Sequence, residues 1–491
     1  MFRAIVRQLI RHTAGYGFNT LVGPIFTILL TPIYTRILTK ADYGTVDTLL
    51  VLNSLLAQLG NVGLRSALVT FYYHPKHSHE QDQIVTSTLW AGVIWSLLLA
   101  TLTFLSAAPL TKISLNRTDV TWLVCWIAIS LPFNTLYSLQ TAIFQLRFAI
   151  WRANLTALIY ILISVSTNIL LIVVLRWGSS GVIIASTTAI IIGGLASIAL
   201  APKNLFSLPK ISLMWNLVQT GIPLVPAGIA IWVLAYQDRL FLVRFVSLSE
   251  LGIYAIANKL VSMLTLLVEP FKAAWNPLAL SIQQQKEAPR TYAKILTYFS
   301  AGGLGIGLAL SLFAYEILLI FTTKEYVEAA NYVWLLVLMP LTSGLHSLVG
   351  IGLLIDKRTG QLGWTIAVAA IINTALNFLL IPPFGVWGAA IATAFGYFAT
   401  PLLTAFVAQH YHPLPFAWGK IFIIFGVYGF LVILGLIVGH TSASLVWRAL
   451  LLLVYLPLLG FFGVFEAREI QLLEQVMRQP KLVFQWLAGR K

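Results

Sequence analysis

The 491 residues of this chain are 59% hydrophobic and only 10% charged. Soluble globular proteins are about 25% charged, so this composition excludes a soluble protein of this size. The net charge of +15 does not indicate nucleic-acid binding, because the basic residues lie between apolar segments and not in one basic domain. Apolar segments of about 20 residues recur along the chain, which is the length of a transmembrane helix, and they are too long for barrel strands. We therefore expect an all-α polytopic membrane protein.

The chain begins with a basic amphipathic segment at residues 1–12, where Arg3, Arg7 and Arg11 alternate with apolar residues. This pattern predicts a short helix lying in the membrane interface and not a cleavable signal peptide. Hydropathy then predicts about fourteen transmembrane helices, the first centred near Phe26. Residues 466–491 contain no further span and are expected to form a cytoplasmic amphipathic tail.

The distribution of Lys and Arg predicts the orientation. With the N-terminus inside, 19 of the 31 basic residues fall on the cytoplasmic side and 8 on the outer side, which satisfies the positive-inside rule. Both termini are therefore expected in the cytoplasm. The other four basic residues lie within apolar segments or at their edges: Arg65, Arg239, Lys259 and Lys272.

Two pairs of short motifs recur at a nearly constant offset, which indicates an internal duplication. Arg36, the acidic Asp42 and Gly44 have counterparts 208 residues later in Arg244, Glu250 and Gly252, and Gly178 and Gly181 recur 207 residues later. We expect two pseudo-symmetric six-helix lobes over 1–206 and 207–412 with a cavity between them. Residues 413–491 would then form two extra transmembrane helices and the tail. Chance agreement of common turn residues is the alternative.

The first helix of each half is interrupted early, by Gly23 and Pro24 in the first and by Gly221, Pro223 and Pro226 in the seventh. Proline removes a backbone donor and kinks a helix. Paired interruptions often mark a transport pathway, although single prolines are also tolerated in membrane helices.

Basic residues inside spans are candidate ligands for an anionic cargo, because an unpaired charge there costs roughly 3 kcal/mol or more. Lys259 is the leading candidate, since it lies deepest, and Arg65 and Lys272 lie near the inner ends of their spans. Arg239 is a further candidate. Snorkelling toward head groups is the alternative for Arg65 and Lys272. Near the outer rim, Arg36 and Arg244 are expected either to handle the released head group or to position their loops.

Two carboxylates are candidate cation-coupling groups, Glu269 and Asp47. Glu269 lies three residues before Lys272, so the two can form an ion pair on one helix face. Asp47 lies in the first turns of its helix, where the helix dipole alone would favour a negative charge. Asp238 is expected to have a structural role between helices. Because neighbouring residues on a helix do not face each other, Asp238 and Arg239 are each expected to need another partner.

The sequence contains no phosphate-binding glycine loop, no zinc-ligand set and no convincing nucleophile–base pair. His74, His77 and His79 are too loosely spaced in a charged loop to favour a metal site. The single Cys125 excludes an intrachain disulfide. We expect no catalytic residues, no cofactor and no metal.

Several segments resemble the bacterial polysaccharide flippases, the Wzx-like branch of the multidrug/oligosaccharidyl-lipid/polysaccharide exporter superfamily. They are Thr31 to Gly44, Asp238-Arg239 with Leu251 to Ala257, Lys324 to Ala330, and Asn377 to Ala390. The resemblance covers residues 1–412, while the last two spans fit by their number only. It implies a V-shaped pair of six-helix lobes with two extra helices, working by alternating access.

The implied cargo is a polyprenyl-pyrophosphate-linked oligosaccharide, moved across the bacterial cytoplasmic membrane for O-antigen, capsule or exopolysaccharide biosynthesis. The implied protein is not an enzyme. We expect a monomer in the lipid bilayer, with glycan polymerase machinery as a further partner and no contact with nucleic acid. The alternatives are a cation-coupled drug antiporter, a lipid II flippase and a glycan-assembly scaffold. The first helices of lipid II flippases are cationic, whereas residues 15–33 carry no charge.

Overall fold

In the computed structural model the described residues, 28, 30–74, 80–202, 207–439 and 442–466, form helices and connecting loops without any strand. Eleven helices in this part of the chain are long and apolar enough to cross a membrane. These helices confirm the expected all-α multi-pass membrane protein. The number of fourteen spans stays a prediction. The expected span near Phe26, the Gly23-Pro24 interruption, the helix over 1–12 and nearly all of the tail lie outside the described residues.

The chain forms two compact units. The amino-side unit contains Phe26–Ile256 and Ile366–Gly396, and the carboxy-side unit contains Ala257–Thr365 and the chain from Tyr397 onward. The two longest helices, α11 and α17, contribute residues to both units. The predicted lobes 1–206 and 207–412 follow a different division and stay a prediction.

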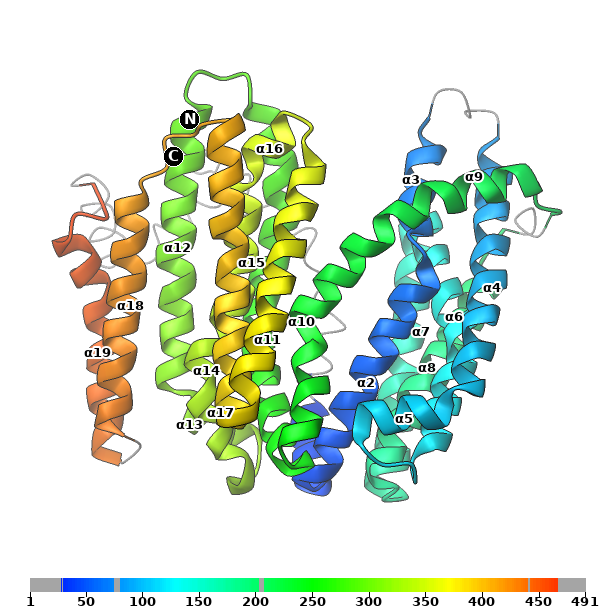
Figure 1. The fold of residues 1–491 in the computed structure, drawn as a ribbon, viewed down its shortest axis with the longest axis horizontal. Helices are drawn as coiled ribbons and strands as arrows, with labels where there is room; N and C mark the ends of the chain where they lie inside the picture. The colour runs from blue at the N-terminus through cyan, green and yellow to red at the C-terminus, as the bar shows by residue number, and fades with distance from the viewer. Residues whose placement is uncertain (1–27, 29, 75–79, 203–206, 440–441, 467–491) are drawn as a thin grey trace. The chain divides into compact units, whose positions relative to one another are not determined.

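The helices of the amino-side unit are α2 (Lys40–Asn61), α3 (Leu64–Tyr72), α4 (Gln81–Leu105), α5 (Ala107–Leu115), α6 (Thr121–Leu146), α7 (Ile150–Asn168), the π-helix η2 (Ile169–Val174), α8 (Gly178–Ala199), α9 (Ile211–Gly221), the 3-10 helix η4 (Ile222–Leu224) and α10 (Val225–Phe245). Those of the carboxy-side unit are most of α11 (Leu248–Ile282), α12 (Ala288–Leu312), α13 (Ala314–Phe321), the 3-10 helix η5 (Lys324–Ala329), α14 (Ala330–Leu336), α15 (Leu338–Val349), α16 (Ile351–Ile355), the ends of α17 (Thr359–Tyr411), α18 (Trp418–Val438) and α19 (Ser442–Phe461). Figure 1 labels most of them.

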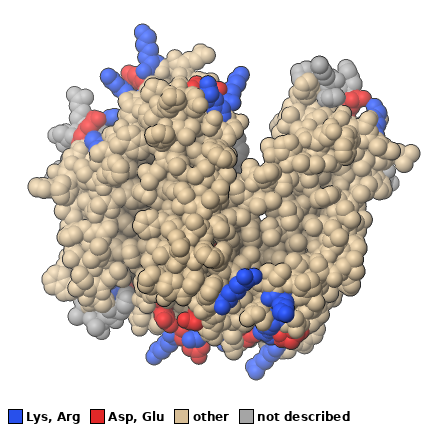
Figure 2. All heavy atoms as spheres, viewed as in Figure 1, with Lys and Arg blue, Asp and Glu red and all other residues tan. Residues whose placement is uncertain are grey.

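The charged residues on the face shown in Figure 2 gather toward the ends of the helices, with an uncharged band between. This distribution is expected of helices that cross hydrocarbon. Each unit has its own buried apolar core. Leu64, Leu139 and Leu217 belong to one cluster of the amino-side unit, and Trp275 and Tyr292 belong to the core of the carboxy-side unit.

Two helices begin with the same capping arrangement, 208 residues apart. At the start of α2, the Asp42 amide donates to Thr39 Oγ1 at 3.1 Å and the Thr39 amide donates to Asp42 Oδ2 at 3.3 Å. At the start of α11, Glu250 and Ser247 exchange the equivalent bonds at 3.2 and 2.9 Å. Both are capping boxes, which satisfy amide donors that have no partner inside the helix. The repeated motif thus forms the same local structure twice.

The glycines of this repeated motif bring the two helices into backbone contact. A Cβ on Gly44 would lie 2.2 Å from the carbonyl oxygen of Leu248, and a Cβ on Gly252 would lie 2.1 Å from that of Lys40. The two contacts are equivalent under the 208-residue offset. Only glycine permits this approach, so α2 and α11 cross where the sequence repeats.

The second repeated motif also has the same backbone conformation in both copies. Gly178 has φ +59° at the start of α8, and Gly385 has φ +53°. Gly385 is a non-helical residue inside α17, which therefore consists of two helices joined by a kink. Because positive φ is cheap only for glycine, this shared conformation supports the duplication.

The predicted interruption of the seventh span is confirmed. α9 ends at Gly221, η4 follows as a 3-10 turn, and α10 begins at Val225. A second break, not predicted, separates α2 from α3 at Val62 and Gly63, which have φ values of +42° and +67°. The two breaks pack on each other, since a Cβ on Gly63 would lie 2.3 Å from the Gly221 carbonyl oxygen.

We expect Gly44→Ala and Gly252→Ala each to destabilise the protein by about 1–3 kcal/mol, because the added methyl group overlaps a backbone carbonyl. Thermal unfolding of the purified protein in detergent would measure the loss. Gly302→Ala is the control, because a Cβ on Gly302 has no neighbour within 4 Å, and it should be neutral or stabilising. A melting temperature unchanged by Gly44→Ala would contradict the close contact.

Candidate functional site

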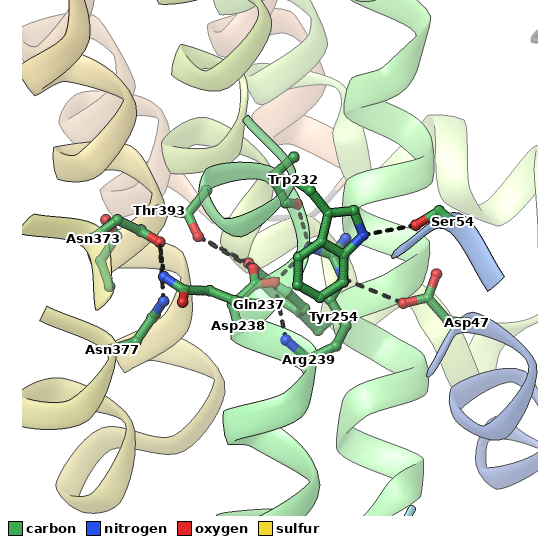
Figure 3. A network of polar contacts seen from close by, with 12 residues as sticks. Asp47, Ser54, Trp232, Gln237, Asp238, Arg239, Tyr254, Asn373, Asn377 and Thr393 are labelled. Atoms are coloured by element: carbon green, nitrogen blue, oxygen red, sulfur yellow. Dashed lines mark hydrogen bonds and ion pairs between the residues drawn. The ribbon is translucent and has the colours of Figure 1, made fainter. Parts of the chain in front are cut away.

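The amino-side unit contains a buried network of charged side chains centred on Arg239 of α10 (Figure 3). The Arg239 guanidinium donates to Asp238 Oδ1 at 2.7 Å from Nη1 and to Asp47 Oδ2 at 3.3 Å from Nε. The side chains of Arg239 and Asp238 are only 5% and 4% exposed, whereas that of Asp47 is 24% exposed. Asp47, on α2, is therefore the accessible member of the network.

Asp238 and Arg239 each have the further partner that was expected, and they also pair with each other, which was not expected. The Cα–Cβ bonds of Asp238 and Arg239 point in different directions around the helix, but the long Arg239 side chain folds back on its own helix. Its Nη1 also donates to the carbonyl oxygen of Ala235, one turn earlier, at 3.1 Å. The flexible stem of arginine thus overrides the geometric rule that separates adjacent helical residues.

Asp238 has the inter-helix contacts that were expected of it. The Tyr254 hydroxyl of α11 donates to Asp238 Oδ2, and the Thr393 hydroxyl of α17 donates to the same oxygen at 3.3 Å. The Tyr254 ring also lies 5.2 Å from the Arg239 guanidinium carbon, which is cation–π distance. One carboxylate and its guanidinium partner therefore join α10, α11, α17 and, through Asp47, α2.

A neutral polar chain continues from this network and was missed from the sequence. Gln237 Nε2 donates to Asn373 Oδ1 at 2.9 Å and to Thr374 Oγ1 at 2.8 Å. Asn377 Nδ2 donates to the same Asn373 oxygen at 3.1 Å. The signal was present, because two asparagines four residues apart in an apolar segment lie on one helix face. On the other side of α10, Trp232 donates to Ser54 of α2 at 2.9 Å.

The other predicted basic residues are divided between the two units. In the amino-side unit, Arg65 of α3 is exposed and its Nη2 lies 3.4 Å from Gln145 Oε1. Arg36 and Arg244 are exposed near the two capping boxes. In the carboxy-side unit, Lys259 is half-buried on α11.

Lys272, also on α11, forms the ion pair that was expected with Glu269, with Nζ to Oε1 at 2.8 Å. It donates a second bond to Ser343 Oγ of α15 at 2.9 Å. The Lys272 and Glu269 side chains are 25% and 51% exposed. These charges are therefore accessible at the surface of the unit, unlike those of Arg239 and Asp238.

Within the described part of the chain, no group of three or more His, Cys, Asp or Glu side chains could hold a metal ion. The accessible basic side chains can bind an anion, and the Asp47 carboxylate can bind a proton or a cation. The predicted roles of the individual residues stay predictions.

Comparison with known proteins gives a family and a fold. Residues 9–283 match a family model described as polysaccharide biosynthesis protein. The succinoglycan biosynthesis transport protein ExoT of Rhizobium meliloti (strain 1021) is 26% identical over 243 residues. That alignment covers 47% of this chain and spans 45% of the relative, which is less than half of its length.

Among solved structures, the lipid II flippase MurJ in an inward closed conformation superposes with a TM-score of 0.73 at 14% identity. The match covers 94% of this chain and 99% of that one. An inward-facing MATE family multidrug transporter of the MOP superfamily gives a TM-score of 0.64 at 12% identity, with 79% and 94% covered. At these identities the similarity shows a shared fold.

Replacing Arg239 with Met should destabilise the protein by about 3–5 kcal/mol, because Asp238 would remain buried without its cationic partner. Thermal unfolding would detect this destabilisation as a large fall in melting temperature. The matched control is Arg117→Met, which removes an exposed arginine from its pair with Asp119 and should change stability by no more than about 1 kcal/mol. Equal effects of the two substitutions would refute the importance of the buried network.

Proposed function

Because this chain belongs to the polysaccharide biosynthesis protein family, we propose that it is a flippase for a polyprenyl-pyrophosphate-linked oligosaccharide. The cargo moves from the cytoplasmic to the outer leaflet, for biosynthesis of O-antigen, capsule or exopolysaccharide. The family match over residues 9–283 carries this proposal. The shared fold with transporters and the name of the partial relative, a biosynthesis transport protein, support it.

Basic side chains in or beside the spans support an anionic head group as cargo. A pyrophosphate leaves water only where cations and donors replace its hydration. Arg65, Lys259 and Lys272 are the proposed ligands, because each is exposed or half-buried in its unit. For Arg239, its burial and two carboxylate partners favour a role in holding Asp47, and its predicted contact with the cargo stays a prediction.

The movement requires no covalent chemistry, so the proposed protein is not an enzyme. The head group enters from the cytoplasm while the polyprenyl tail stays in lipid, and a change in the two units then opens the path outward. The backbone contact of Gly44 with α11 lies at the expected outer ends of α2 and α11, where it is a suitable pivot. Arg36 and Arg244 lie beside it in the sequence and would handle the released head group. We place the protein in the bacterial cytoplasmic membrane as a monomer, with both termini in the cytoplasm.

Asp47 is the proposed coupling carboxylate. It is the more accessible of the two carboxylates at Arg239, and its 3.3 Å contact is longer than the 2.7 Å contact of Asp238. A proton or cation reaching Asp47 would weaken its bond to Arg239 and so loosen α2 from α10. Glu269 is the second candidate, and its pairing with Lys272 links it to the proposed cargo site.

The proposal is tested by translocation in proteoliposomes containing a labelled polyprenyl-pyrophosphate oligosaccharide. An external glycan-modifying enzyme reports which leaflet holds the sugar. Lys259→Ala, Arg65→Ala and Lys272→Ala should each slow transport about tenfold or more, because a charge-assisted bond contributes about 1.5–3 kcal/mol. Lys324→Ala, which removes an exposed lysine of η5, should transport like the wild type.

Full activity in all three variants would remove the cationic site from the proposal. No movement by folded wild-type protein across several glycans would favour the drug-antiporter or scaffold alternatives. Transport of lipid II in preference to other glycans would identify the protein as a lipid II flippase.

Asp47→Asn should abolish the dependence of transport on an imposed proton or sodium gradient while leaving slow, gradient-independent movement. The amide keeps the shape of the carboxylate but cannot gain or lose a proton. The same proteoliposomes, with and without each gradient, measure the effect, and Asp119→Asn in the exposed Arg117 pair is the control. A variant that still responds fully to the gradient would shift the coupling role to Glu269.

A further inference from the structure

One face of α11 in the carboxy-side unit is polar and accessible, opposite a face that is fully buried. Glu269, Lys272, Ala273 and Asn276 follow at intervals of three, one and three residues, so they lie on one side of the helix. All four are exposed or half-buried. The opposite side packs into the apolar core through residues that include Ala274, Trp275, Leu278 and Ala279.

Two serines of α15 lie along this face, one turn apart. Ser343 accepts the bond from Lys272, and the Ser347 hydroxyl donates to Asn276 Oδ1 at 3.2 Å. Both serines are half-buried, and each is followed by a buried residue of the same helix. We call Glu269, Lys272, Ala273, Asn276, Ser343 and Ser347 the polar strip.

The bonds within the polar strip leave part of its hydrogen-bonding capacity unused. Because Ser347 occupies Asn276 Oδ1, the amide nitrogen of Asn276 offers its two donors, and no described residue accepts them. The Lys272 ammonium has three donors, two of which go to Glu269 and Ser343. Pro277 has no N–H, so it cannot bond the carbonyl of Ala273 four residues earlier.

This mixture of groups matches a phosphorylated sugar better than a simple anion. A phosphate needs a cation, which Lys272 supplies. Sugar hydroxyls are both donors and acceptors, so they need donors such as Asn276 and acceptors such as the Ala273 carbonyl. Glu269 lies 21 residues after the start of α11, about 31 Å along the helix, which is close to the thickness of the hydrocarbon core.

We propose that the polar strip is the saccharide subsite of the carboxy-side unit, in which Lys272 holds the phosphate and Asn276, fixed by Ser347, reads the hydroxyl groups of the attached sugar. This inference rests on the proposed flippase function and on its orientation, which puts the strip at the cytoplasmic entrance. It adds a site that distinguishes the glycan from its lipid carrier.

The test is binding to the purified full chain in nanodiscs of phosphatidylcholine, followed by intrinsic tryptophan fluorescence. The probes are a polyprenyl pyrophosphate and the same carrier bearing a single hexose, with glucose and galactose tested in turn. Wild type should bind at least one glycosylated carrier about three- to tenfold more tightly than the bare carrier, the effect of one or two neutral hydrogen bonds. Asn276→Ala should remove this preference without changing the affinity for the bare carrier.

Three further variants separate the roles within the strip. Ser347→Ala should reduce the preference partly, because Asn276 loses the bond that orients it. Lys272→Met should reduce the affinity for both carriers about ten- to a hundredfold, because a charge-assisted bond is lost. Ser281→Ala, which removes an exposed hydroxyl of α11 outside the strip, should bind all probes like the wild type, and melting temperatures confirm that each variant is folded.

Equal affinity of the wild type for bare and glycosylated carriers would overturn the saccharide subsite while leaving the flippase proposal intact. A preference that survives Asn276→Ala would also overturn it. Nanodiscs containing phosphatidylglycerol form the second arm: if this lipid competes fully with both carriers and Asn276→Ala has no effect, the strip is a phospholipid head-group site. Failure of the wild type to bind or move any carrier would instead reject the proposed function itself.

Discussion

A charged side chain inside a hydrocarbon-spanning helix needs an opposite charge or water, and the buried charges of this protein follow that constraint. Arg239 lies between Asp238 and Asp47. In the carboxy-side unit, the fully buried Arg448 of α19 donates to both carboxylate oxygens of Glu316 on α13, at 3.0 and 2.5 Å. The Arg239–Asp47 and Arg448–Glu316 pairs each join helices that are distant in sequence, so each guanidinium connects helices within its own unit.

The duplicated motifs impose a second constraint, which acts through the backbone. Capping boxes begin α2 and α11 at equivalent positions, and the two glycines that follow let these helices touch at carbonyl distance. The same amino-side unit contains the packed breaks at Gly63 and Gly221. At both breaks the chain changes from one helix to the next, from α2 to α3 and from α9 to α10.

The charges suitable for handling cargo differ from those that hold the fold. Arg239 and Arg448 are buried and paired with carboxylates, while Lys272 and Glu269 are accessible on the surface of their unit. A transporter needs both kinds, because a cargo ligand must release its partner at each cycle and a structural ion pair must not. Asp47 lies between the two classes, attached to the buried network yet 24% exposed. This intermediate position makes it a suitable place for coupling.

The sequence by itself determined the membrane class, the helical architecture, the two repeated motifs and the break before α10, because hydropathy, capping and proline act over a few neighbouring residues. It also predicted the Glu269–Lys272 pair, which lies within one helix turn. Only the tertiary structure decided that Arg239 bonds both Asp238 and Asp47, that Gln237 bonds Asn373 and that Ser347 bonds Asn276. Most of these contacts join side chains that are 71 to 192 residues apart, and no local rule specifies which helices meet or how a long side chain bends.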